Sequence, residues 1–130
     1  MPEVGQEVER VGLRLRFERI DPDLLVMDAS YEGNSQMPPA HLHPNQIEHF
    51  TVLEGRMHTV INGIERTYEP GEEFEVPVAT VHQMSPLGPT RVTWEVRPSL
   101  RTAEFFERLA SGQVDENFLT EFGDEISFSV

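Results

Sequence analysis

Apolar and polar residues alternate along most of the chain before Pro98, which is typical of half-buried β-strands. The first clear case has apolar side chains at 11, 13, 15 and 17 and charged ones at 14, 16 and 18. Since successive side chains of a strand point to opposite faces, this pattern predicts a strand with one buried face. By the same criterion we expect strands at 11–17, 24–29, 48–53, 56–61, 64–68, 74–76, 81–84 and 91–96.

Turn signals separate these segments. Asn62-Gly63 is a strong hairpin signal, because a type I′ turn needs positive φ at both central residues. Pro70-Gly71 predicts another turn, and the stretch from Gly33 to Pro39 predicts a loop. Short strands at such even spacing predict an all-β sandwich or barrel.

The period changes after Pro98. Residues 103–110 place Phe105, Phe106 and Leu109 on one side of a short amphipathic helix, with Thr102 as the expected N-cap and Gly112 beyond its end. Residues 113–130 are acidic, and apolar residues at 126, 128 and 130 predict a last short strand. The polar residues 1–10 are expected to fray. We therefore expect one domain over 1–130, with a barrel at 11–98, a helix at 102–111 and a tail at 113–130.

Composition narrows the function. The chain has 130 residues, which suits one domain, and 23 acidic against 10 basic residues give a formal charge of −13. This charge disfavours nucleic acid and anionic membranes as partners. No apolar run can span a membrane or serve as a signal peptide, so a cytoplasmic protein is expected. All basic residues are arginine and cysteine is absent, which excludes lysine Schiff bases, thiolate nucleophiles and cysteine-ligated metals.

Three histidines and one glutamate stand out against this background. His41 and His43 are two residues apart and share one face of an extended chain, Glu48 follows five residues later, and His82 lies far along the sequence. Two imidazoles, a carboxylate and a third imidazole are suitable ligands for a first-row divalent metal ion. We expect these four side chains to converge on one metal ion inside the barrel. His49 and His58 are expected to be surface or packing residues.

The same residues resemble the two motifs of the cupins. The first cupin motif is Gly, five residues, His-x-His, three or four residues, Glu, six residues and Gly; His41, His43, Glu48 and Gly55 match it, and Ser35 replaces the leading glycine. The second is Gly, five residues, Pro-x-Gly, two residues, His, three residues and Asn. The matching residues are Gly71, Pro77 and His82, while Ala79 and Pro86 depart from it.

This resemblance to small single-domain cupins implies a double-stranded β-helix, or jelly-roll barrel, with one C-terminal helix. It also implies a divalent transition metal ion (Fe, Mn, Ni, Zn or Cu) held by His41, His43, Glu48 and His82, with open coordination positions. Phe50, Met57, Met84 and Trp94 are the expected lining of a substrate pocket, and Glu48 is the candidate proton acceptor.

The function remains open at this level. A metal-dependent enzyme acting on a small organic molecule is the first interpretation, with a dioxygenase-like reaction ahead of the others. A metal-dependent isomerase or epimerase is the second, and a non-enzymatic ligand-binding or sensing barrel is the third. The resemblance also implies a homodimer, and strand 11–17 is expected to leave a sheet edge that needs cover.

Overall fold

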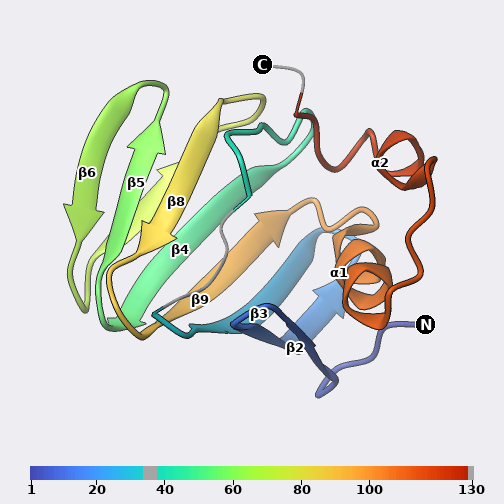
Figure 1. Cartoon of the computed structure of the whole chain (residues 1–130), viewed down its shortest axis with the longest axis horizontal. Coiled ribbons are helices and arrows are strands. Elements are labelled where there is room, and N and C mark those ends of the chain that lie inside the picture. The colour runs from blue at the N-terminus through green and yellow to red at the C-terminus, as the bar shows by residue number, and fades with distance from the viewer. Residues whose placement is uncertain (34–37, 129–130) are drawn as a thin grey trace.

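The computed structural model, described here for residues 1–33 and 38–128, consists of two antiparallel β-sheets and two helices at one end of the barrel (Figure 1). The larger sheet has the order β1-β2-β3-β9-β4-β7, and the smaller has the order β6-β5-β8. The larger sheet contains β1 (Glu7–Arg10), β2 (Leu13–Asp21), β3 (Leu24–Tyr31), β4 (Ile47–Glu54), β7 (Glu73–Val76) and β9 (Thr90–Arg97). The smaller sheet contains β5 (Met57–Ile61), β6 (Ile64–Tyr68) and β8 (His82–Pro86). This arrangement is a double-stranded β-helix, which confirms the predicted fold class.

The core follows from the alternation of side chains. Along β4, Glu48, Phe50 and Val52 are buried while Ile47 and Leu53 are exposed. Strand register then places inward-facing residues of neighbouring strands side by side. Phe50 pairs with Phe74 on one side and with Trp94 on the other, and its ring stacks on both. Each such buried aromatic ring contributes about 2–3 kcal/mol through apolar burial alone.

The N-terminus differs from the prediction. Residues 1–10 were expected to fray, yet Glu7–Arg10 form β1 and pair with β2. Val11 and Gly12 both have positive φ and make the two-residue turn of this hairpin, so the predicted strand 11–17 starts two residues later, at Leu13. A single bulge-like register shift after Phe17 lets β2 continue to Asp21. The alternation criterion missed β1, because a polar edge strand lacks a clear alternation of apolar and polar side chains.

The predicted helix is confirmed as α1 (Thr102–Ser111), and Gly112 ends it with φ 76°. The predicted cap is wrong, because Arg101 is the N-cap residue and Thr102 is the first residue of the helix. The Thr102 hydroxyl instead accepts a hydrogen bond from Gln46, whose amide also donates to the carbonyls of Pro98 and Ser99. Gln46 is only 2% exposed, and these bonds tie the start of α1 to β4.

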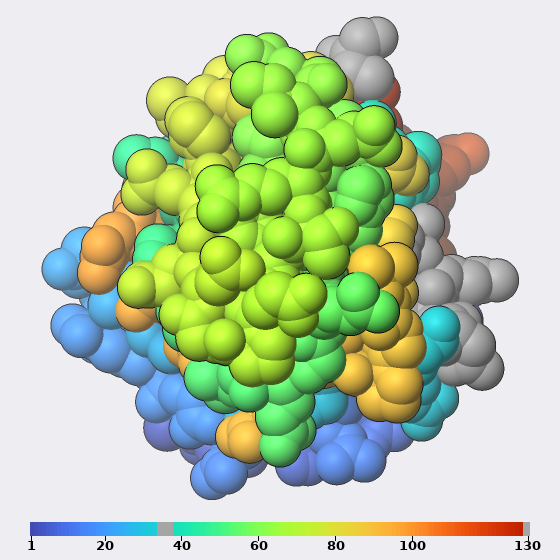
Figure 2. Space-filling view, turned by 90° about the vertical axis from the view of Figure 1, so that its left-hand side faces the viewer, coloured from blue at the N-terminus to red at the C-terminus, as the bar shows by residue number. Residues whose placement is uncertain are grey.

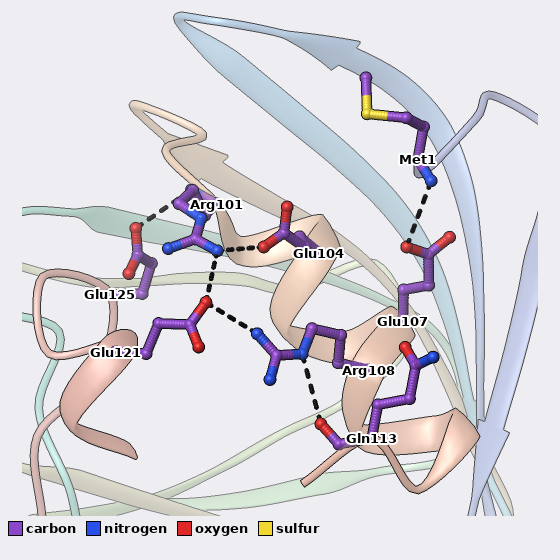
Figure 3. A network of polar contacts seen from close by, with 8 residues as sticks. All are labelled: Met1, Arg101, Glu104, Glu107, Arg108, Gln113, Glu121 and Glu125. Carbon is purple, nitrogen blue, oxygen red and sulfur yellow. Dashed lines mark hydrogen bonds and ion pairs between the residues drawn. The ribbon is translucent and has the colours of Figure 1, made fainter. Parts of the chain in front are cut away.

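A second short helix, α2 (Phe118–Glu121), was not predicted. Its Phe118 and the nearby Phe122 pack on Phe105 of α1, forming a small apolar cluster beside the main core. Figure 3 shows the polar contacts that join the same two segments. Arg101 and Arg108 both bind the Glu121 carboxylate, at 2.8 and 2.7 Å, and Arg101 also contacts Glu104. The C-terminal segment is therefore packed firmly against α1.

In the described part of the predicted last strand, residues 126–128, the structure has an isolated β-bridge between Leu42 and Ser127. Two backbone hydrogen bonds, both of 2.9 Å, join these two residues. Ser35, Val130 and residues 34–37 of the predicted loop fall outside the described residues. Neither helix in the described part of the chain is long and apolar enough to cross a membrane.

Gly55, the last residue of the first motif, provides a test of this packing. It has φ +77°, and a Cβ there would lie 2.2 Å from the Pro89 carbonyl oxygen. Gly63, in the β5–β6 hairpin on the face that Figure 2 shows, also has φ +77°, but a Cβ there meets nothing within 4 Å. We expect Gly55→Ala to destabilise the fold by about 3 kcal/mol or more, and Gly63→Ala by about 1 kcal/mol. Chemical denaturation of both variants checks this, and equal losses would contradict the proposed clash.

Candidate metal centre

The histidine cluster lies where β8 meets the segment before β4. His41 and His82 form an isolated antiparallel bridge, with backbone hydrogen bonds of 3.1 and 2.9 Å between them. Because His43 follows His41 by two residues, its ring reaches the same side of the chain. The ligand-capable nitrogens of the three rings lie within 4.8 Å of one another. The structure thus brings together side chains from two distant segments of the sequence.

Backbone carbonyls fix the orientation of all three rings. Nδ1 of His41 donates to the Pro39 carbonyl at 2.9 Å, and Nδ1 of His82 donates to Thr80 at 3.0 Å. Nδ1 of His43 donates to the Glu125 carbonyl at 2.7 Å, so the C-terminal segment positions this ring. Since a carbonyl oxygen only accepts, each Nδ1 carries the hydrogen, and the neutral ring presents its Nε2 lone pair to the centre of the cluster.

Glu48 completes the cluster from β4. Its side chain is 1% exposed, and Oε1 lies 3.1 Å from Nε2 of both His43 and His82. Its other oxygen, Oε2, accepts a 2.8 Å hydrogen bond from the indole nitrogen of Trp94. Among the described residues, Oε1 of Glu48 and Nε2 of His43 are buried without a hydrogen bond of acceptable geometry.

This arrangement fits a cation. Lone pairs on Oε1 and on two neutral Nε2 atoms face one another across 3.1 Å, which is unfavourable unless a proton or a metal ion lies between them. Two atoms that bind one ion at about 2.1 Å and at right angles are about 3 Å apart. Three imidazoles and one carboxylate also match the donor preference of a divalent transition metal ion. The cluster is therefore suited to hold such an ion.

Burial and the neighbouring side chains shift the pKa values of the residues in the cluster. Burial alone would raise the pKa of Glu48, but the His43 and His82 rings outweigh it and lower this pKa to about 2. Burial opposes the charged form of His43, yet the Glu48 carboxylate prevails and raises its pKa above the ordinary 6.5. His41 lacks such a partner, and burial lowers its pKa to about 4. His43 therefore keeps its proton to a higher pH than His41 does.

A cavity of about 470 Å³ opens from this cluster. Phe50, Met84 and Trp94, three of the four residues expected to line a pocket, line it together with the cluster. Met57, the fourth, does not line this cavity and is fully buried in the core. On β5, Ile61 lies opposite His82 while Met57 lies opposite Pro86, so Met57 is four residues, or about 13 Å, away along the strand.

Sequence reasoning missed most of the other walls of the cavity. They come from β1 and the turn after it, from α1 and from the C-terminal segment, and they are mainly apolar: Val8, Val11, Phe105, Phe106, Leu109, Ala110, Val114, Phe118, Leu119, Ile126 and Phe128. Tyr31 on β3 also lines the cavity, and burial together with the nearby Glu48 charge raises its pKa. Its alternation with Met27 and Ala29 on one face of a strand was a usable signal.

The other two histidines lie outside the cluster. His49 contacts Glu73 at 2.8 Å and Glu95 at 3.5 Å on the outer face of β4. His58 contacts Thr67 and Glu65 on the small sheet. Both therefore provide matched controls for changes to the cluster.

The fold and the site together define a class of β-barrel proteins that carry a candidate metal centre. Comparison with known families identifies it: the cupin domain profile matches residues 28–96, and the chain belongs to the cupin family. A 45-residue stretch is 42% identical to an oxidoreductase of Arthrobotrys oligospora. That stretch is 35% of this chain and only 17% of the fungal protein.

Solved structures share the fold at low sequence identity. KdgF from a Halomonas species has a TM-score of 0.68 at 20% identity, covering 75% of this chain and 91% of its own. A single-site variant of the Streptomyces protein PAC13, solved with uridine, has a TM-score of 0.60 at 17% identity, with 75% and 81% coverage. A sugar phosphate isomerase of Silicibacter pomeroyi has a TM-score of 0.58 at 19% identity, with 66% and 59% coverage. These similarities support the fold alone.

We expect the affinity of the centre for a divalent metal ion to increase with pH until His43 has lost its proton. A proton on Nε2 of His43 competes for the lone pair that would bind the ion, and the pKa of His43 lies above 6.5. Below that pKa, the apparent dissociation constant should rise up to about tenfold per pH unit. Competition with a chromophoric chelator at several pH values measures this, with His49→Ala as control. An affinity that does not change with pH would contradict it.

Proposed function

We propose that this cupin is a metal-dependent enzyme acting on a small organic molecule, and that an oxygenase-type reaction is the first candidate. The observation that carries the proposal is the buried Glu48 oxygen facing two histidine nitrogens at 3.1 Å beside a cavity of about 470 Å³. A purely structural site has no need of such a cavity. The partial identity to a fungal protein called an oxidoreductase agrees with this reaction class.

Each residue of the centre has a distinct role in this proposal. His41, His43, His82 and Glu48 would hold the ion, and the three Nδ1 hydrogen bonds keep the rings oriented before it binds. When bound there, a redox-active ion would supply O₂ activation, and a redox-inert ion would act as a Lewis acid. Trp94 anchors one oxygen of Glu48, which leaves the other oxygen to bind the ion or to accept a substrate proton. The apolar walls exclude water from the substrate.

Elemental analysis of protein purified without added metal tests this proposal. Iron in stoichiometric amount, with turnover lost under anaerobic conditions, would support the oxygenase. A redox-inert metal with O₂-independent turnover would favour the isomerase or epimerase, which the named sugar phosphate isomerase makes the second candidate. Metal without turnover of any compound that binds would favour a sensing barrel, and absence of any metal affinity would overturn the proposal.

A homodimer remains our expectation for the assembly. The sheet edge is formed by β1 rather than by the predicted strand 11–17, and β1 has only four residues with charged side chains at Glu7, Glu9 and Arg10. Such a short charged edge protects against open-ended association but still allows one symmetric contact. Light scattering at micromolar protein and moderate salt is expected to give twice the chain mass of 14.9 kDa. A monomer mass would contradict the dimer.

A further inference from the structure

The cavity beside the cluster is polar at one end and apolar elsewhere. Its volume of about 470 Å³ equals that of about fifteen water molecules, so it is large enough for a substrate of ordinary metabolite size. At one end lie the histidines and Glu48. The other walls are formed by aromatic and aliphatic side chains of α1, β1 and the C-terminal segment, and the ring of Phe128 in that segment lies 5.4 Å from the His41 ring, centroid to centroid.

The charged residues that β1 contributes to the cavity make hydrogen bonds within the protein. Arg10 is the one cationic residue among the described lining residues, and its guanidinium donates to the Leu109 carbonyl at 3.1 Å. Glu9 accepts a 2.9 Å hydrogen bond from Arg14. A ligand covered with hydroxyl groups would therefore leave many of its polar atoms unsatisfied against these walls, at about 1–3 kcal/mol for each group.

Tyr31 adds a hydroxyl group to the lining of the cavity. Its side chain is 5% exposed and lines the cavity, but its hydroxyl makes no hydrogen bond with any of the described residues. Buried hydroxyls are almost always hydrogen-bonded in folded proteins. An unpaired donor that faces a cavity next to a candidate metal centre is therefore available for a ligand.

We propose that the cavity binds an apolar, ring-bearing small molecule with a single oxygen head group, and that the Tyr31 hydroxyl donates a hydrogen bond to this oxygen. The apolar body of the ligand lies against Phe105, Phe106 and Phe118. This inference rests on the proposed function for the role of the metal centre, and it defines the substrate class as apolar rather than a polyol or a nucleoside. Tyr31 is a positioning residue in this arrangement.

Three probes and two variants test the proposal on zinc-loaded protein, because zinc is redox-inert and allows binding without redox turnover. 2-Naphthol has the ring and the oxygen, naphthalene has only the ring, and uridine has a polar body. Trp94 is the only tryptophan of the chain and lines the cavity, so its fluorescence reports binding of the ring compounds. Competition against 2-naphthol measures uridine. Tyr31→Phe removes only the hydroxyl, and Tyr68→Phe is the control, since Tyr68 is buried against Phe74 away from the cavity.

We expect 2-naphthol to bind the wild type and the Tyr68→Phe variant equally, and the Tyr31→Phe variant about three- to tenfold more weakly. Naphthalene should bind wild type and Tyr31→Phe alike, since it has no oxygen to accept the hydrogen bond. Uridine should bind at least about tenfold more weakly than 2-naphthol. A loss that is equal for both ring compounds, uridine binding as tight as 2-naphthol, or no binding of either ring compound would overturn the proposal.

The metal content of the same samples separates this test from that of the proposed function. If zinc binds but uridine outcompetes 2-naphthol, the metal centre stands and the substrate class is wrong. If zinc does not bind, the proposed function fails, while naphthalene binding to the same protein still reports whether the walls accept an apolar ring.

Discussion

Replacing His82 by alanine is expected to weaken metal binding by at least about 100-fold and to remove the stabilisation that the metal provides. Loss of a partner outside the coordination sphere already costs about 10–100-fold in affinity, and loss of a direct ligand costs more. At a metal concentration 100 times the wild-type dissociation constant, bound metal stabilises the native state by about 2.7 kcal/mol. For a chain of this length, that corresponds to a fall in Tm of roughly 10 °C.

The measurement compares each variant with and without metal, because the His82 ring is buried and its removal also changes the metal-free fold. His41→Ala and His43→Ala are expected to behave like His82→Ala. His49→Ala and His58→Ala should retain full metal content and the full metal-dependent rise in Tm, since both rings lie outside the cluster. A stoichiometric metal content in His43→Ala would exclude the proposed ligand set.

The local pattern of apolar and polar residues was sufficient to predict much of the fold. Alternation along β4 correctly assigned Glu48 and Phe50 to the inside and His49 to the outside, because a strand has a fixed period of two. Motif spacing correctly placed His41 and His82 together even though the second motif departs from the family pattern. Ala79, which replaces a glycine there, still has φ 55°, so the backbone keeps the turn that glycine would make.

Contacts between residues that are far apart in the sequence could not be predicted from the local pattern. Met57 has the correct parity for the barrel interior, but only strand register shows that it lies at the far end of β5 from His82. The Glu125 carbonyl that orients His43 is a backbone atom 82 residues away, and a backbone acceptor leaves no signature in residue type. The same holds for Tyr31, because a hydroxyl is seen to be unpaired only when its surroundings are known. The acidic tail, predicted as little more than a strand, proves to be a wall of the cavity and a support of the histidine cluster.

Glu48→Gln is expected to lower metal affinity by roughly 10–100-fold while leaving the metal-free protein, above the pKa of His43, as stable as the wild type or more stable. The substitution keeps the shape but removes the negative charge that a bound cation would hold ionised. In the metal-free wild type above the raised pKa of His43, Oε1 lies 3.1 Å from Nε2 of His43 and of His82, with no proton shared between Oε1 and His43. A glutamine can place its oxygen towards the Trp94 N–H and its NH₂ group towards those nitrogens, so that acceptor-to-acceptor contacts become hydrogen bonds worth about 1 kcal/mol.

Metal titration and thermal unfolding of the metal-free and metal-loaded forms, at a pH above the pKa of His43, measure both effects. Glu48→Gln should bind metal more weakly than the wild type but better than His43→Ala, because it retains all three imidazoles. Any turnover at saturating metal should fall by more than occupancy explains, since the amide cannot accept a proton as the carboxylate does. Trp94→Phe is the control for packing, because it removes the indole donor but keeps the Glu48 charge. Wild-type affinity and rate in Glu48→Gln would reduce the centre to three histidines and leave Glu48 with a packing role only.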